Sequence, residues 1–155
     1  MREPLTLVTK TGRAALALGL VSAWFVGDRL LKAIAQTADP HSLGSWLAFR
    51  PTANTGIAFS LPLPAALATW LMAIAVGLTL VIAVWQWSAG RRWFPWLLVA
   101  VGGSSNVLDR LRYDAVIDYL SIGSWSVFNL ADVLIVFGLL LLLLPARLTN
   151  RLFAS

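Results

Sequence analysis

The sequence predicts an all-α integral membrane protein with four transmembrane helices and a small extracytoplasmic β-containing segment between the first two helices. Of the 155 residues, 59% are hydrophobic and only 12% are charged, whereas a soluble globular domain has about 25% charged residues. Four apolar stretches also approach the roughly 20 residues that a helix needs to cross a bilayer. They cover residues 14–35, 65–87, 93–111 and 129–144. We therefore expect one polytopic domain over residues 1–155.

The distribution of basic residues predicts how these helices are oriented. Three basic groups flank the stretches on what becomes one side of a four-helix bundle: Lys10 and Arg13, Arg91 and Arg92, and Arg147 and Arg151. Cytoplasmic loops of membrane proteins are rich in Lys and Arg, so we expect both termini in the cytoplasm. The basic residues behind the net charge of +5 are therefore explained by the orientation of the helices in the membrane. They leave no exposed basic domain of the kind that binds nucleic acid.

The first stretch carries charges near its outer end. Asp28 and Lys32 are four residues apart, which places them on one helical face in a favourable order for an ion pair. Two interpretations are open for this pair. Lys32 can extend outward to the interface, or both groups can point into the bundle or toward a substrate.

Residues 39–64 form the longest non-helical stretch, on the outer side. Short apolar runs at 42–49 and 57–61 are separated by the turn signal Asn54-Thr55-Gly56, which predicts a small sheet on the membrane surface. A plain hairpin turn is the alternative role for Asn54 and Gly56. Trp46 and Phe49 are expected to anchor this sheet in the interface.

The second stretch has no charged residue and is expected to be scaffold. Tryptophans cluster around Arg91 and Arg92 where the second stretch meets the third, which predicts an aromatic belt at the inner interface: Trp85, Trp87, Trp93 and Trp96. Pro95 falls in the first turn of the third stretch, where its missing N–H does no harm.

The third stretch combines small and polar residues. Residues 102–105 read Gly-Gly-Ser-Ser, and small residues let a neighbouring membrane helix approach closely. Asn106, Asp109 and Arg110 follow at positions i, i+3 and i+4 and are expected to form one polar cluster. A simple ion pair between Asp109 and Arg110 at the helix end is the alternative.

Two aspartates carry the chemistry that the sequence predicts. Asp118 lies in the apolar run 116–120, and Asp132 lies at the start of the fourth stretch. An ionisable group at membrane depth is costly and is by default a functional-site hypothesis, and two acids that meet can share a proton and activate water. A helix-capping box explains Asn129 and Asp132 equally well. A solvated loop carboxylate is the alternative for Asp118.

Other chemistries are excluded by composition. The chain has no cysteine and a single histidine, His41. Thiolate catalysis and a zinc site of the usual kind cannot be assembled from these residues. We expect no metal or cofactor.

Five ordered motifs, spread over nearly the whole chain, resemble those of the lipoprotein signal peptidases, the bacterial signal peptidase II enzymes. They are Asp28-x-x-x-Lys32, Asn54-x-Gly56-x-Ala58-Phe59, Gly102-x-x-x-Asn106-x-x-Asp109-Arg110, Val116-x-Asp118-Tyr119 and Phe128-Asn129-x-Ala131-Asp132. The resemblance implies an intramembrane aspartyl endopeptidase of the bacterial inner membrane. Such an enzyme removes signal peptides from prolipoproteins by cutting before a diacylglyceryl-modified cysteine.

The resemblance also implies the roles of individual residues. Asp118 and Asp132 would be the catalytic pair. The substrate-binding and supporting residues would be Asp28, Lys32, Asn54, Gly56, Gly102, Asn106, Asp109, Arg110, Asn129 and Ala131. Expected partners are diacylglyceryl-modified prolipoproteins, membrane lipid and globomycin-type inhibitors.

The sequence departs from the usual family pattern without losing a catalytic group. Leu31 stands where Ser or Thr commonly precedes the lysine, and Ser105 replaces a glycine. Ile57 and Tyr119 replace the more usual Ala and Phe. Two functions from other classes stay open, a small proton-coupled membrane transporter and a non-catalytic membrane scaffold.

Overall fold

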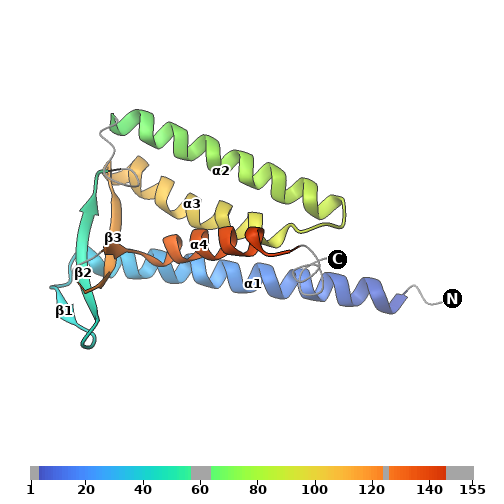
Figure 1. The fold of residues 1–155 in the computed structure, drawn as a ribbon, viewed down its shortest axis with the longest axis horizontal. Coiled ribbons are helices and arrows are strands. Elements are labelled where there is room, and N and C mark those ends of the chain that lie inside the picture. Colours follow the sequence, from blue (N-terminus) through green and yellow to red (C-terminus); the bar gives the residue numbers. More distant parts are fainter. Residues whose placement is uncertain (1–3, 57–63, 124–125, 146–155) are drawn as a thin grey trace.

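The computed structural model describes residues 4–56, 64–123 and 126–145. Within them the chain forms α1 (Pro4–Ala35), α2 (Ala65–Ser88), α3 (Phe94–Tyr113) and α4 (Leu130–Leu143). Four strands complete the fold: β1 (His41–Ser42), β2 (Leu47–Asn54), β3 (Val116–Ile122) and β4 (Ser126–Phe128). The helices run side by side along the length of the molecule, and the strands lie across one end of them (Figure 1).

The helices agree with the predicted mostly helical membrane fold. Two of the described helices are long and apolar enough to cross a membrane, at Ala14–Ala35 and Ala65–Ser88. The α3 helix has 20 residues but carries the polar run that ends in Arg110. The apolar α4 helix has only 14 residues, because Asn129 caps its start and Pro145 follows its end. By length and composition, α1 and α2 are therefore the two candidate membrane-spanning helices among the described residues. The α3 helix is more polar than they are, and α4 is shorter.

The small residues of α3 let its two neighbours approach closely, as the sequence predicts. A methyl group at Gly102 would lie 2.5 Å from the Ala131 carbonyl oxygen on α4. One at Gly103 would lie 2.6 Å from Val76 Cγ2 on α2. Both distances are shorter than real Cβ contacts, so a larger residue at either position would require a shift, of the α4 backbone at Gly102 and of the Val76 side chain at Gly103. Figure 1 shows α3 between α2 and α4.

The sheet differs from the prediction in where its strands come from. It is antiparallel with the order β1-β2-β3-β4, and β2 pairs with β3 so that Thr52 faces Asp118. The expected β-containing segment between the first two helices supplies only β1 and β2, while β3 and β4 belong to the connection between α3 and α4. The run 42–49 is split between β1 and β2, and the run 57–61 lies outside the described residues.

One predicted membrane anchor is wrong. Phe49 is 7% exposed, and its ring centroid lies 5.9 Å from that of Tyr119 and 5.2 Å from that of His41. The alternation of β2 turns Phe49 inward, where it joins Ala35 and Ile117 in a buried cluster. Trp46, between β1 and β2, is 78% exposed and remains available as an interfacial side chain.

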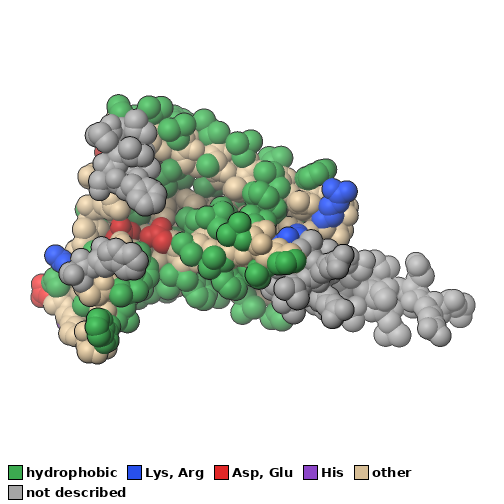
Figure 2. All heavy atoms as spheres, in the orientation of Figure 1, with side chains coloured by type: hydrophobic (Ala, Val, Ile, Leu, Met, Phe, Trp, Pro, Cys, Tyr) green, Lys and Arg blue, Asp and Glu red, His purple; other side chains and the backbone are tan. Residues whose placement is uncertain are grey.

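Charged side chains differ between the two ends of the molecule. Figure 2 shows red acidic side chains together with a blue basic one near the sheet, and only blue ones among the charged side chains drawn at the opposite end, where α2 turns into α3. At that opposite end Trp85 and Trp87 are exposed and Trp93 is buried. The expected cluster of aromatic and basic side chains is therefore present at one end of the bundle.

Candidate active site

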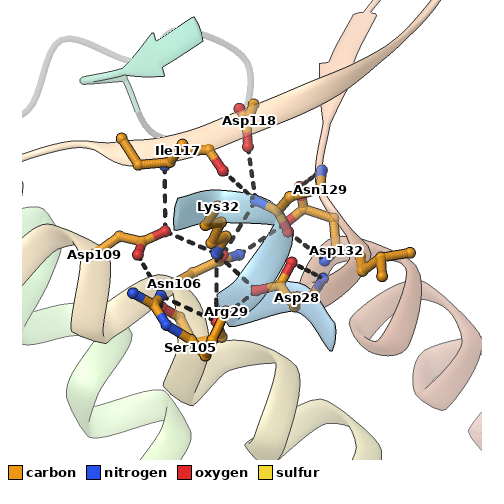
Figure 3. A network of polar contacts seen from close by, with 12 residues as sticks. Asp28, Arg29, Lys32, Ser105, Asn106, Asp109, Ile117, Asp118, Asn129 and Asp132 are labelled. Carbon is orange, nitrogen blue, oxygen red and sulfur yellow. Dashed lines mark hydrogen bonds and ion pairs between the residues drawn. The ribbon is translucent and has the colours of Figure 1, made fainter. Parts of the chain in front are cut away.

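A fully buried lysine lies at the centre of the polar cluster beneath the sheet (Figure 3). Lys32 Nζ lies 3.0 Å from Asp28 Oδ2 and 2.7 Å from Asp109 Oδ2, and it donates to Asn106 Oδ1 at 2.8 Å. The interpretation in which Lys32 extends outward is therefore wrong. A buried ammonium needs opposite charges and hydrogen-bond acceptors around it, and two carboxylates supply them here.

Asp109 connects three elements. Its carboxylate pairs with Lys32 and with Arg29, both from α1, and Oδ2 accepts the backbone N–H of Ile117 at 3.2 Å. This contact fixes β3 one residue before Asp118. Arg29 is not predicted as a site residue, because nothing in the residues around it indicates that its partner, Asp109, lies on another helix.

Arg110 turns away from this cluster. Its guanidinium donates to the carbonyl oxygens of Thr55, at 3.4 Å, and Gly56. The expected single cluster of Asn106, Asp109 and Arg110 thus includes only the first two, and the alternative Asp109–Arg110 ion pair is not formed. Successive residues on a helix project about 100° apart, so Asp109 faces α1 while Arg110 reaches the end of β2.

Asp118 is a buried strand residue, not a solvated loop carboxylate. It is 3% exposed, and it accepts hydrogen bonds from Asn54 Nδ2 at 3.0 Å and from Asn129 Nδ2 at 2.7 Å. The pKa of Asp118 is raised to about 6, chiefly by burial and further by the nearby charge of Asp132. The hydrogen bonds from both asparagines lower the pKa, because they stabilise the ionised form.

Asp132 both caps α4 and faces the polar cluster. Its Oδ2 accepts the backbone N–H of Asn129 at 3.1 Å, and its own N–H donates to Asn129 Oδ1 at 2.9 Å. This is the capping box that the sequence predicts. The other oxygen, Oδ1, accepts from Asn106 Nδ2 at 2.8 Å. Capping therefore engages one oxygen of Asp132 and leaves the other in the polar cluster.

Two asparagines link the aspartates to each other (Figure 3). Asn129 Nδ2, which donates to Asp118, also lies 3.2 Å from Asn106 Oδ1. Because the Lys32 ammonium has donors and no acceptor, Asn106 must turn its oxygen toward Lys32 and its nitrogen toward Asp132. A buried positive charge thus sets the direction of the hydrogen bonds that reach both carboxylates.

Asp28 fixes the start of α4 from outside that helix. Its Oδ1 accepts from the Tyr119 hydroxyl at 2.9 Å and from the Ala131 N–H at 3.2 Å, while Oδ2 accepts from Ser105 Oγ at 2.6 Å. The Tyr119 oxygen in turn accepts the Leu130 N–H at 3.0 Å. The first N–H groups of a helix lack partners within it, and here Asp28 and Tyr119 provide them.

Every predicted supporting residue is therefore placed. Gly102 and Ala131 contribute through the close contact of α3 with α4, and Gly56 contributes its carbonyl oxygen to Arg110. Ser105 and Tyr119 are not predicted as site residues, although Ser105 belongs to the run of small residues on α3 and Tyr119 to one of the five motifs. Both contact Asp28, and their hydroxyl groups were the available signal, since a buried hydroxyl needs a partner.

An apolar groove leads to Asp132. It has a volume of about 420 Å³ and is lined by Ser126, Phe128, Asp132, Val133, Val136, Phe137 and Leu140. Because Asp132 lines this groove, its carboxylate can meet an extended apolar ligand lying along α4. Among the described residues no group of three His, Cys, Asp or Glu side chains is placed to hold a metal ion.

The comparisons with known proteins concern most of the chain. A family model described as signal peptidase (SPase) II matches residues 20–147, a range that includes every candidate site residue. The lipoprotein signal peptidase of Xanthomonas axonopodis pv. citri is 37% identical over 142 residues, covering 81% of this chain and 82% of that protein. The one of Synechococcus sp. is 37% identical over 122 residues, covering 72% and 80%.

Other matches are shorter. The lipoprotein signal peptidase of Moorella thermoacetica is 39% identical over 90 residues, and the match spans 50% of this chain and 60% of that protein. The match to the Beijerinckia indica protein also spans 60% of its length. A solved bacterial membrane enzyme at 18% identity has the same fold, with a TM-score of 0.72 over 88% of this chain and 90% of that one.

Proposed function

This chain belongs to the signal peptidase II family, and we propose that it is an intramembrane aspartyl endopeptidase that removes signal peptides from lipoprotein precursors. The observation that carries this proposal is the pair of carboxylates, Asp118 and Asp132, joined through the amides of Asn129 and Asn106. The proposed substrate is a prolipoprotein whose cysteine carries diacylglycerol, and the proposed cut lies directly before that cysteine.

The proposed reaction uses one ionised and one protonated aspartate with a water molecule between them. The ionised aspartate takes a proton from the water molecule as the water oxygen attacks the scissile carbonyl carbon. The protonated aspartate donates its proton to the developing oxyanion. Collapse of the tetrahedral intermediate breaks the C–N bond and returns a proton to the leaving amine. The proton belongs to the coupled pair. The raised pKa of Asp118, about 6, supports a shared proton near neutral pH.

The supporting residues hold the two carboxylates in fixed orientations. Asn54 and Asn129 donate to Asp118, and Asn106 donates to Asp132. Catalytic groups held by packed neighbours need little reorganisation during reaction. Lys32 acts through Asn106 in this proposal, and Arg110 acts by holding the end of β2.

We propose that all four helices cross the inner membrane with the candidate site near its outer face. The 14 residues of α4 span about 21 Å, less than the roughly 30 Å of the hydrocarbon core. If the end of α4 reaches the cytoplasmic surface, Asp132 at its start lies below the outer surface. The connection between α2 and α3 lies at the end away from the sheet (Figure 1) and contains Arg91 and Arg92, which supports a cytoplasmic location for that end.

The apolar groove beside Asp132 supports a substrate that stays in contact with lipid. Its walls, Val133, Val136, Phe137 and Leu140 on α4, suit the apolar part of a signal peptide that enters sideways from the bilayer. A globomycin-type inhibitor is expected to compete at this site. The reaction needs no metal or cofactor. A transporter would more often carry polar groups at the midplane, whereas here they gather at one end of the bundle.

Product analysis tests this proposal most fully. Purified protein in lipid nanodiscs would be given a prolipoprotein with and without diacylglycerol on its cysteine, and the fragments would be weighed by mass spectrometry. We expect cleavage of the lipidated form before the cysteine and inhibition by globomycin. Cleavage elsewhere, or equal cleavage of both forms, would contradict the proposed specificity.

A further inference from the structure

A second apolar groove lies at the end of the bundle away from the candidate site. It has a volume of about 200 Å³ and runs between α1, α2 and α3. Its walls include Leu18 on α1, Leu80, Val84 and Trp87 on α2, and Trp93 and Leu97 on α3. Trp87 and Trp93 flank the α2–α3 turn in the sequence, so the groove opens beside that turn.

Two arginines occupy the turn. Arg91 is exposed, and its guanidinium carbon lies 5.5 Å from the centre of the Trp85 ring. Arg92 donates one hydrogen bond from Nη2 to the Leu141 carbonyl oxygen in the last turn of α4. Its Nε is buried and has no hydrogen-bond partner among the described residues. Because this Nε is buried, the donors that the turn can offer to a ligand are the guanidinium of exposed Arg91 and the Nη groups of partly exposed Arg92.

No described acid balances these charges. The aspartates of the described residues all belong to the sheet, its connections, or the parts of α1, α3 and α4 near the sheet: Asp28, Asp39, Asp109, Asp114, Asp118 and Asp132. Figure 2 shows the blue side chains at the α2–α3 end set apart from the red ones. The field at the turn is therefore positive and suits an anion.

We propose that the α2–α3 turn and the groove beside it bind one anionic phospholipid. An acyl chain lies in the groove, and the phosphate contacts Arg91 and Arg92. Exposed tryptophans at headgroup depth frame the site, and basic side chains near a membrane surface attract anionic lipid. A choline or ammonium headgroup brings a cation toward the arginines and binds less well. The site is independent of the proposed peptidase activity, since it requires only that the helices lie in a membrane.

Native mass spectrometry of the full-length protein tests the proposal without an activity assay. The protein would be released from micelles that contain equal amounts of dioleoylphosphatidylglycerol and dioleoylphosphatidylcholine. We expect phosphatidylglycerol to be retained roughly tenfold over phosphatidylcholine, from two arginines at a few-fold each. Arg91→Gln/Arg92→Gln is expected to reduce this preference below about twofold, whereas Arg91→Lys/Arg92→Lys keeps most of it. Ala14→Phe, in the groove wall, is expected to lower retention of the anionic lipid.

Two further variants keep the result decisive. Arg50→Gln/Arg112→Gln removes the same charge from exposed positions near the sheet, including one arginine that lies 5.3 Å from the Tyr113 ring, and is expected to leave the preference unchanged. Arg91→Gln alone leaves the Arg92–Leu141 contact intact and is expected to lower the preference about threefold. A wild-type protein without preference, an unaffected Arg91→Gln variant, or an equal loss in the control would overturn the proposal.

Discussion

The side-chain amide of Asn129 donates to the Asp118 carboxylate across 2.7 Å. Asn129 also caps α4. Its side-chain oxygen accepts the Asp132 backbone N–H, and its backbone N–H donates to the Asp132 carboxylate. One asparagine therefore sets the positions of both aspartates. In the proposed mechanism Asn129 keeps the two carboxylates in fixed relative positions, because neither can shift without disturbing its hydrogen bond with Asn129.

Substitution of Asn129 can separate its two roles. Serine is also a good N-cap residue but cannot reach Asp118, so Asn129→Ser is expected to keep most of the thermal stability and lose at least about tenfold in activity. Asn129→Ala removes both contacts and is expected to cost about 1–2 kcal/mol in addition. Thermal unfolding and cleavage rates would be measured on the same preparations. Full activity in Asn129→Ser would show that the contact with Asp118 is dispensable.

Asn54 is expected to tune the pH dependence of cleavage. Its hydrogen bond lowers the pKa of Asp118, which burial has raised to about 6. Removing the donor in Asn54→Ala raises that pKa further, so the limb of the pH–rate profile that follows Asp118 ionisation moves to higher pH. Thr52→Ala on the same strand is the matched control, because Thr52 is exposed and its hydroxyl contacts only the Arg50 carbonyl oxygen among the described residues. A shift to lower pH in Asn54→Ala is incompatible with this assignment.

Gly102 is expected to control the separation of α3 and α4. A methyl group there would lie 2.5 Å from the Ala131 carbonyl oxygen, so Gly102→Ala must push apart the helices that carry Asn106 and Asp132. We expect a loss of about 1–3 kcal/mol and a large fall in activity. Gly77→Ala on α2 meets no atom within 4 Å and is expected to be neutral or stabilising by up to about 1 kcal/mol. Equal behaviour of the two variants in thermal unfolding would contradict the close-contact explanation.

Tyr119 is expected to affect stability more than chemistry. Tyr119→Phe removes the hydroxyl that joins Asp28 to the Leu130 N–H, at a cost of about 1–2 kcal/mol. Asp28 still accepts the Ala131 N–H, so we expect cleavage to fall only a few-fold. Tyr113→Phe, whose ring lies against Arg112, is the control. A loss of activity as large as that of an aspartate variant would assign Tyr119 a direct part in the reaction.

Local sequence patterns predict the mostly helical fold, whereas the roles of the candidate site residues follow only from the family resemblance and stay predictions. Apolar length located α1 and α2, and the small residues at 102–103 correctly indicated close packing. The Asn129–Asp132 spacing predicted the capping box. These features depend on neighbours within a few residues, or on side-chain size, and can be read directly from the chain.

Features that depend on distant partners were missed. The pairing of β2 with β3 joins segments on either side of α2 and α3, so no local pattern announces that one sheet contains both. The contact of Arg29 with Asp109 and that of Arg110 with Gly56 likewise depend on how α1, α3 and β2 meet. Phe49 appeared to be a surface aromatic because its partner Tyr119 comes from a strand 70 positions later.

Cleavage by matched aspartate variants tests the central claim most directly. Wild type, Asp118→Asn, Asp132→Asn and the exposed control Asp39→Asn would be assayed on a diacylglyceryl-modified prolipoprotein, with thermal unfolding of each variant as a check of folding. We predict that wild type and Asp39→Asn cleave at similar rates, while both site variants stay folded and lose cleavage by more than about a thousandfold. Near-wild-type cleavage by folded Asp118→Asn or Asp132→Asn would contradict the proposed aspartyl mechanism.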